Sequence, residues 1–153
     1  MSVLPRLALA ATLVFSSACD GTTDPSASNA GVYALSTING AALPFSETTT
    51  EDGVSFTIRV NSGSTDLRSD GTFTQTLAFS VIVNGGSETV VSIAQGTWTM
   101  NGTTATFIAT SFRVNGEAQP PDATPVNAQV ANGRLTMVDA DAEPVPHTMV
   151  FVR

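Results

Sequence analysis

The chain has no lysine, one cysteine and one histidine among its 153 residues. Without lysine it cannot form a Schiff base, a Walker-type phosphate loop or a Ser–Lys dyad. A single cysteine cannot form an internal disulfide or a multi-cysteine zinc site, and a single histidine excludes a multi-histidine metal centre. We therefore expect no resident metal or cofactor and no catalytic residues, so that the protein is not an enzyme.

Basic residues are scarce. Thirteen acidic residues oppose six basic ones, all of them arginines, and the formal net charge is −7. A protein that binds nucleic acid needs basic surface to displace counterions from the phosphates. This charge balance therefore excludes nucleic acid as a partner.

Residues 1–18 have the three regions of a secretory signal peptide. Arg6 supplies a positive charge, and Leu7–Phe15 is an apolar run of nine residues. That run is too short for a membrane-spanning helix, which needs about 20 residues. The small residues of Ser16–Ala18 complete the pattern that a signal peptidase reads, so we predict export.

Cys19 follows directly, and this stretch resembles a bacterial lipoprotein signal, in which small residues precede a cysteine that becomes lipidated. Ser16 stands where that family usually has leucine, and Ser16 with Ala18 also suits ordinary signal cleavage. We therefore expect a lipid anchor on Cys19, with a secreted or periplasmic soluble form as the alternative. Residues 19–30 then comprise the anchor and a polar, flexible tether.

Residues 31–153 are predicted to be one all-β domain. Apolar residues alternate with polar ones, as in the run from Val54 to Val60, which indicates strands with one buried face. Seven dipeptides that favour hairpin turns divide the chain: Asn39-Gly40, Asp52-Gly53, Asp70-Gly71, Asn84-Gly85, Asn101-Gly102, Asn115-Gly116 and Asn132-Gly133. We expect an antiparallel up-and-down meander of about eight strands that closes into a lipocalin-like barrel, with a β-sandwich as the alternative.

The turns also predict strand registers. A two-residue loop at Asn101-Gly102 places Trp98 opposite Ala105, and one at Asn132-Gly133 places Val130 opposite Leu135. Three proline-containing segments are expected to be loops or weak strands. They are 41–51, 117–125 and 140–146.

The start of this domain resembles that of small, mostly uncharacterised bacterial envelope lipoproteins. The resemblance rests on Gly31–Gly40 (GVYALSTING) followed by Leu43-Pro44, on Asp70–Phe73, and on the terminal Val150–Arg153. Those proteins have a lipocalin-like or META-like β-barrel. The resemblance therefore implies a barrel at the cell envelope, and it carries over no catalytic residue.

The candidate catalytic and metal-binding residues all have simpler explanations. His147 lacks a G-x-S-x-G elbow that would supply a serine partner, so we expect an ordinary strand-end histidine. Asp139, Asp141 and Glu143 have oxygen ligands for Ca²⁺ but lack the glycine and distant glutamate of an EF-hand loop, which favours a solvated acidic loop. The carboxylate sets Glu51-Asp52 and Asp66/Asp70, candidates for glycoside chemistry, are best explained as turn formers.

Four aromatic residues are candidates for the wall of an apolar ligand cavity: Phe56, Phe79, Trp98 and Phe107. An eight-stranded barrel is just wide enough either to be filled by side chains or to hold one small ligand. We therefore expect a non-enzymatic, monomeric, membrane-anchored envelope lipoprotein that binds a small apolar ligand or lipid, with Gln75 or a threonine orienting its polar end. The alternative is a structural or interaction module with a packed core that contacts an envelope protein or glycan.

Overall fold

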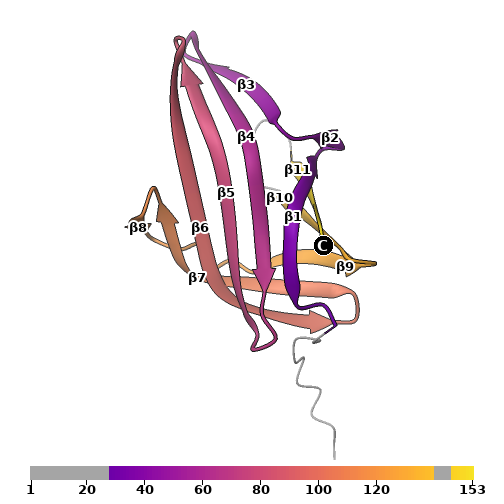
Figure 1. Ribbon diagram of the computed structural model, residues 1–153. Coiled ribbons are helices and arrows are strands. Elements are labelled where there is room, and N and C mark those ends of the chain that lie inside the picture. Colours follow the sequence, from indigo (N-terminus) through magenta and orange to yellow (C-terminus); the bar gives the residue numbers. More distant parts are fainter. Residues whose placement is uncertain (1–27, 140–145) are drawn as a thin grey trace, which may run out of the picture.

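Eleven antiparallel strands form one sheet in the computed structural model, which describes residues 28–139 and 146–153 (Figure 1). The strands are β1 (Gly31–Ile38), β2 (Ala41–Ala42), β3 (Phe45–Glu51), β4 (Val54–Leu67), β5 (Thr72–Val83), β6 (Gly86–Asn101), β7 (Thr104–Val114), β8 (Glu117–Gln119), β9 (Val126–Ala131), β10 (Arg134–Asp139) and β11 (His147–Val152). Eight of them close into a ring in the order β1-β11-β10-β9-β7-β6-β5-β4, and β4 pairs again with β1. The predicted lipocalin-like up-and-down barrel is confirmed, and its closed ring excludes the sandwich.

Two segments that were expected to be loops or weak strands contain added strands. Residues 45–51 form β3, which pairs with β4 from Phe45 opposite Val60 to the β3–β4 turn. The prediction of a loop there was wrong because Pro44 only precedes the strand, where it costs no ladder hydrogen bond. Residues 117–119 likewise form β8 on the edge of β7, and the prolines come after it.

Most of the Asn-Gly and Asp-Gly dipeptides form two-residue hairpin turns. Five of them have positive φ at both residues, as the twist-matched type I′ turn requires. They are Asn39-Gly40, Asp52-Gly53, Asn84-Gly85, Asn115-Gly116 and Asn132-Gly133. The register predicted around the last of these is confirmed, since Val130 pairs with Leu135.

The register predicted at Asn101-Gly102 was wrong by two residues. Asn101 pairs with Thr104, so the strands are joined by Gly102 and Thr103, and Trp98 faces Phe107 instead of Ala105. A slip of two residues leaves each side chain on its original face because strands repeat with period two. Trp98 and Phe107 therefore still point into the barrel.

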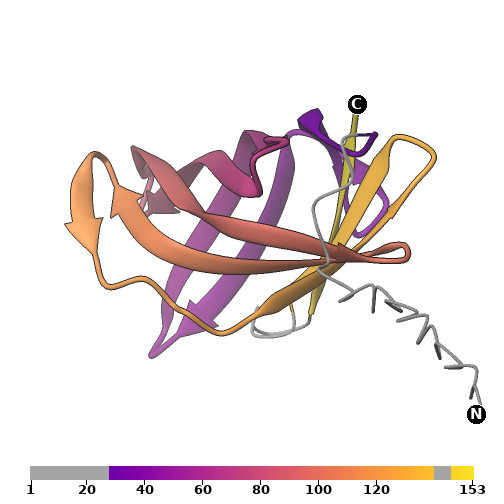
Figure 2. The same ribbon diagram turned by 90° about the horizontal axis from the view of Figure 1, so that it is seen from below.

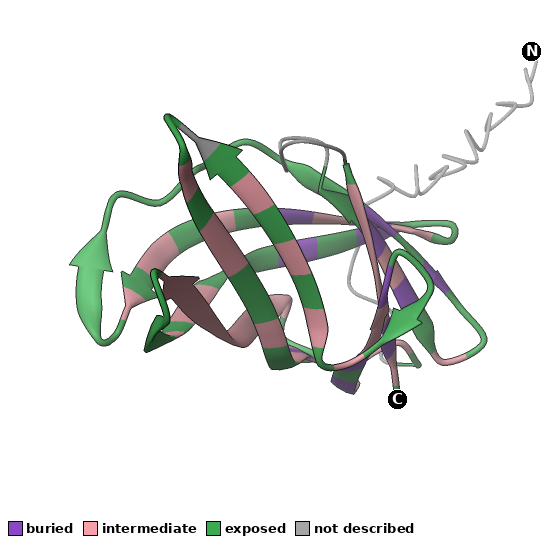
Figure 3. Ribbon diagram, turned by 90° about the horizontal axis from the view of Figure 1, so that it is seen from above, coloured by how far each residue is buried: buried purple, intermediate pink, exposed green. Residues whose placement is uncertain are grey.

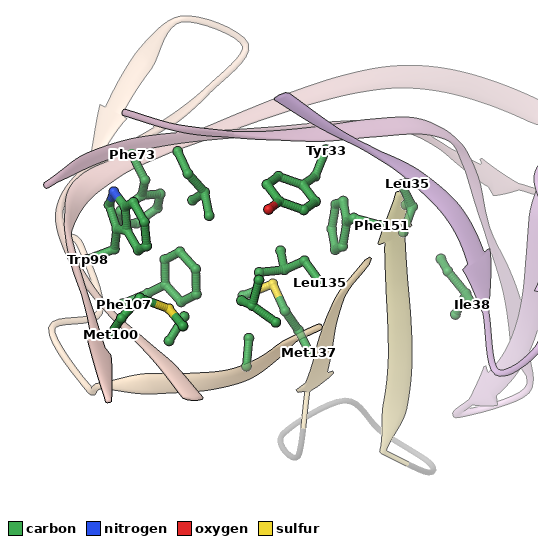
Figure 4. Close-up of a cluster of buried hydrophobic side chains, with 14 residues drawn as sticks. Tyr33, Leu35, Ile38, Phe73, Trp98, Met100, Phe107, Leu135, Met137 and Phe151 are labelled. Atoms are coloured by element: carbon green, nitrogen blue, oxygen red, sulfur yellow. The ribbon is translucent and has the colours of Figure 1, made fainter. Parts of the chain in front are cut away.

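One end of the barrel is filled by side chains, and we call it the closed end (Figure 4). The most deeply buried large side chains include Trp98, Tyr33 and Phe151, each with at most 1% of its surface exposed. The indole N–H of Trp98 donates to the Arg68 carbonyl at 3.0 Å, and the Tyr33 hydroxyl donates to a main-chain carbonyl. Among the described residues, every buried side-chain nitrogen and oxygen has a hydrogen-bond partner, as a well-packed core requires.

A sharp bend in β6 and β7 carries these two strands across the closed end (Figure 2). The ladder between them has an irregularity between Gln95 and Gly96, next to the point where Gly96 pairs with Ala109. A Cβ at Gly96 would overlap the Ile108 carbonyl oxygen and lie 2.9 Å from the Ala109 Cα. Only glycine permits the two backbones to approach this closely.

The opposite end divides into two lips and is called the open end. Strand β1 pairs with β4 over Gly31–Ala34 only, and β7 pairs with β9 over Thr104–Phe107 only. Beyond these pairs the long lip comprises β3 to β8 and the short lip comprises β9, β10, β11, β1 and β2. Strands β4 and β5 of the long lip have few buried residues beyond the closed end (Figure 3).

The described chain starts at the closed end. Arg153, the residue after β11, donates from Nη1 to the Ser28 and Ala30 carbonyls, both at 2.9 Å. None of the residues in the two described ranges belongs to a helix that is long and apolar enough to cross a membrane. The predicted signal peptide and Cys19 lie outside the described residues, as does most of the tether.

Candidate functional site

A hollow of about 280 Å³ lies between the two lips at the open end. The long lip contributes most of its wall from β3 and β4, and the short lip contributes the ends of β1, β10 and β11. The lining residues are Ile38, Phe45, Glu47, Thr49, Phe56, Ile58, Val60, Asp139 and His147. We call this space the lip hollow. Its size is near the lower limit of ligand pockets, which are roughly 300–1,000 Å³.

The wall on the long lip is apolar because of strand periodicity. Phe56, Ile58 and Val60 alternate along β4, so their side chains share the inner face of the sheet. Ile58 keeps 45% of its surface exposed, and none of the three is fully buried. The lip hollow therefore offers apolar side chains that the protein itself covers only in part.

The same inner face continues across the neighbouring strands in register. Phe45 of β3 lies opposite Val60, Val60 lies opposite Phe79 of β5, and Phe79 lies opposite Val90 of β6. Directly opposite partners on adjacent strands place their side chains on the same side of a sheet. Phe79 thus belongs to the apolar face that extends from the lip hollow, one strand away from its wall.

A polar contact joins the two lips at the edge of this face. His147 Nε2 lies 2.5 Å from Glu47 Oε2, and the two side chains are 22% and 26% exposed. The Phe45 ring meets the imidazole edge-on, with the ring centroids 5.7 Å apart. Asp139 lies directly opposite His147 in the ladder between β10 and β11. The lip hollow therefore combines an apolar wall with a rim of one imidazole and two carboxylates.

A second hollow, of about 480 Å³, lies at the other gap between the lips, where β7 and β9 separate. Its lining is more polar and includes Asp122, residues 124–127, Met137–Asp139, Met149 and Gln75. Gln75 projects into the barrel, where its Nε2 lies 3.3 Å from Thr65 Oγ1 and 3.4 Å from the Met137 sulfur. Gln75 is thus already held by protein groups between the packed core and this hollow.

Asp122 belongs to a local turn within this second hollow. Its Oδ1 accepts the Thr124 backbone N–H at 2.8 Å. Hydrogen bonds from the Thr124 side chain and backbone hold the pKa of Asp122 below its usual value. A carboxylate at this position therefore stays ionised at neutral pH.

The four aromatic residues predicted from the sequence do not share one cavity. Phe56 lines the lip hollow and Phe79 extends its apolar face, whereas Trp98 and Phe107 are buried in the core at the closed end. Phe107 packs edge-on against Phe73, with centroids 5.1 Å apart. Trp98 and Phe107 line neither of the two hollows.

Sequence reasoning missed Phe45, Glu47 and Thr49 as wall residues. They alternate with period two, which is a strand signal, but the adjacent proline and the threonine-rich sequence favoured a loop. It also treated His147 as an isolated histidine. Its partner, Glu47, is 100 residues away in the chain, so only the closed barrel brings the two together.

The carboxylates considered for catalysis or metal binding are mostly dispersed. Asp66 pairs with Arg68 at 3.2 Å, and Asp70 accepts hydrogen bonds from Thr72 in the β4–β5 turn. Within the described ranges, no group of three His, Cys, Asp or Glu residues could hold a metal ion. Residues 141 and 143 and the side chain of Glu51 lie outside the described parts.

The chain matches no protein-family model, and no curated protein is significantly similar to it. The resemblance to small envelope lipoproteins therefore stays a prediction. A proposal for the function of this protein therefore rests on the barrel and the lip hollow.

Proposed function

We propose that this is a non-enzymatic, membrane-anchored lipoprotein of the bacterial cell envelope that binds a small apolar ligand in its lip hollow. The observation that carries the proposal is the partly exposed apolar wall formed by Phe45, Phe56, Ile58 and Val60 above a packed core. Isolated exposed apolar residues are common, but a concave group of them at the mouth of a barrel is typical of ligand sites.

The driving force would be burial of apolar surface. Removing about 200 Å² of apolar surface from water contributes roughly 5 kcal/mol. Part of this is offset by the ligand's lost translational and rotational freedom, so we expect dissociation constants in the range of roughly 1 μM to 1 mM. A hollow of about 280 Å³ suits a ligand with one short alkyl chain or one or two rings.

Methyl NMR can test binding directly. In a titration with octanol, the methyl signals of Ile38 and Ile58 should shift, because both residues line the lip hollow. The signals of Leu135, which is fully buried, and of Ile108, which is 40% exposed on β7, should not shift. Unchanged Ile38 and Ile58 signals at millimolar octanol would refute the proposal.

A matched pair of variants separates the site from the general surface. Ile58→Asn places an amide in the apolar wall and should weaken octanol binding about ten-fold, since it removes about 1.4 kcal/mol of apolar contact. Ile108→Asn makes the same change at a similarly exposed position outside both hollows and should leave affinity unchanged. Equal loss in both variants would contradict a site in the lip hollow.

The anchor is a separate part of the proposal. Acyl chains on Cys19 would attach the protein to a membrane through the tether, each buried methylene contributing roughly 0.8 kcal/mol. Because Arg153 holds Ser28 and Ala30 at the closed end, such a tether would join the barrel at the end opposite the open end. In the native host, Cys19→Ser should move the protein from the membrane fraction to the soluble fraction, and an unchanged distribution would refute the anchor.

The alternative is an interaction module that contacts an envelope protein or glycan. It is supported by apolar side chains exposed elsewhere on the barrel, including Val32 at 59% and Val138 at 51%. The octanol titration discriminates between the two proposals, because a module of this kind needs no shift at Ile38 and Ile58. In either case we expect a monomer without nucleic-acid partners.

A further inference from the structure

The two hollows are lined by acidic groups and by no arginine. The lip hollow has Glu47, Asp139 and His147 in its lining, and the second hollow has Asp122 and Asp139. The two carboxylates give the lining of the lip hollow a formal charge of −2 when the imidazole is neutral. The formal charge is −1 when the imidazole is protonated. No protonation state of His147 makes this lining positive.

A further carboxylate lies on the same inner face of the long lip. Four residues stand directly opposite one another across β3, β4, β5 and β6 in the order Glu47, Ile58, Val81 and Glu88. Adjacent strands are about 4.8 Å apart, so this row has carboxylates at both ends of a short apolar span. The apolar face is thus bordered by negative charge on β3 and on β6, and by Asp139 on the short lip.

The five arginines of the described residues lie elsewhere. Arg59 alternates with Ile58 and Val60 along β4, so it points to the outer face, and Arg113 donates to the Gly116 carbonyl at the β7–β8 turn. The other three are at the closed end: Arg68 next to the β4–β5 turn, Arg134 opposite Val152, and Arg153 beside Ser28. An anionic head group in the lip hollow would therefore meet carboxylates and no arginine, and even a protonated His147 would leave the lining with a net negative charge.

From this charge distribution we propose that the lip hollow selects amphiphiles that carry a protonated amine. The inference rests on the proposed ligand-binding function and names the class of ligand. The alkyl or ring portion lies against Phe56, Ile58 and Val60, and the ammonium group lies at the rim between Glu47 and Asp139. Fatty acids and other anionic amphiphiles of the same chain length are rejected, because burial near fixed carboxylates leaves their charge unpaired.

Three amphiphilic probes with the same chain length but different head groups test this selectivity. Octylammonium, octanol and octanoate are titrated separately at neutral pH and low salt, with Ile38 and Ile58 methyl signals as the readout. Octylammonium should bind at least ten-fold more tightly than octanoate, with octanol between them. Raising the ionic strength should narrow this difference, because the rim is partly exposed to water.

Variants assign the preference to the rim. Glu47→Gln should lower octylammonium affinity about five-fold, the upper range for a partly exposed ion pair, and should lower octanol affinity by a clearly smaller factor. Glu117→Gln makes the same charge change on β8, outside both hollows, and should alter neither affinity. The methyl signal of the core residue Leu135 reports whether each variant is folded, and Asp139→Asn provides the same test from the short lip should Glu47→Gln fail to fold.

The outcomes separate this inference from the proposed function. If octanol binds but octanoate binds as well as octylammonium or better, the lip hollow is an apolar site and the amine preference is refuted. A loss of octanol and octylammonium affinity in equal proportion in Glu47→Gln would also refute it, since the carboxylate would then act only on structure. If none of the three probes shifts Ile38 or Ile58, the proposed function itself is overturned.

Discussion

Gly96 is the position where one added methyl group should perturb the barrel most. A Cβ there would overlap the Ile108 carbonyl oxygen and lie 2.9 Å from both the Ile108 carbonyl carbon and the Ala109 Cα. Carbon atoms in favourable contact are about 3.5 Å or more apart. All three obstructing atoms belong to the backbone of β7, so no side-chain rotation can relieve the overlap.

The expected cost of Gly96→Ala follows from this geometry. Overpacking in a rigid site costs roughly 1–3 kcal/mol, and displacing β7 weakens one or two ladder hydrogen bonds of about 1 kcal/mol each. Alanine also lowers the conformational entropy of the unfolded chain, which offsets about 0.4–1 kcal/mol of this destabilisation. The net loss in the free energy of unfolding should therefore be about 3 kcal/mol.

Urea denaturation followed by fluorescence measures this loss. Trp98, two residues from the substitution, is 1% exposed and is the only tryptophan, so its emission reports directly on unfolding. Gly86→Ala is the matched control on the same strand, since its Cβ would meet only the Val83 carbonyl at 3.4 Å, and it should change stability by less than about 0.5 kcal/mol. A loss below about 1 kcal/mol in Gly96→Ala would refute the close approach of β6 and β7.

Three further predictions concern the closed end and the hairpin turns. Trp98→Phe should lower the free energy of unfolding by about 2 kcal/mol, measured by circular dichroism, because it removes buried surface and the bond to the Arg68 carbonyl. Asp70→Asn should destabilise the protein above about pH 4 but not in strong acid. Hydrogen bonds from Thr72 hold the pKa of Asp70 below 3.8, so its stabilising effect is complete above that value and is lost as the pH falls through the folded pKa. Asn132→Ala should cost about 1 kcal/mol in thermal unfolding, because residue 132 has a φ of 52° and alanine disfavours positive φ.

Each of these predictions has a result that contradicts it. Unchanged stability in Trp98→Phe would mean that the indole is neither packed nor bonded as described. A stability difference for Asp70→Asn that is the same at pH 2 and pH 7 would exclude a role for its ionised form. For the turn, Asn132→Gly should be close to wild type, and a loss equal to that of alanine would show that φ is not the cause.

The barrel itself could be predicted because its signals are local. Alternation gives each strand its buried face, and the Asn-Gly and Asp-Gly dipeptides give the turns, five of which adopt positive φ at both positions. The wrong register predicted for Trp98 shows that a turn dipeptide does not always fix which residues form the loop. At Asn101-Gly102 the loop instead consists of Gly102, which has a φ of 60°, and Thr103, so that Asn101 pairs with Thr104 and Trp98 lies opposite Phe107.

The lip hollow could be predicted only in part. Phe56 was a candidate because aromatic residues on an inner face are visible in the alternation along β4. Glu47 and His147 form their contact through the closure of the ring, which no short pattern encodes. Trp98 and Phe107 carry the same alternation signal as Phe56, yet they fill the core, because their depth in the barrel depends on the bend at Gly96.

The division into two lips has a consequence for motion. Within the described residues, β1 leaves β4 after Ala34 and β7 leaves β9 after Phe107, so no backbone ladder spans either gap at the open end. Small changes of strand twist that widen the mouth would therefore break no ladder hydrogen bond, although they would separate Glu47 from His147. Breathing of the mouth and global unfolding are then separate processes, and slow amide exchange in β4 and β5 is compatible with rapid passage of a ligand between the lips.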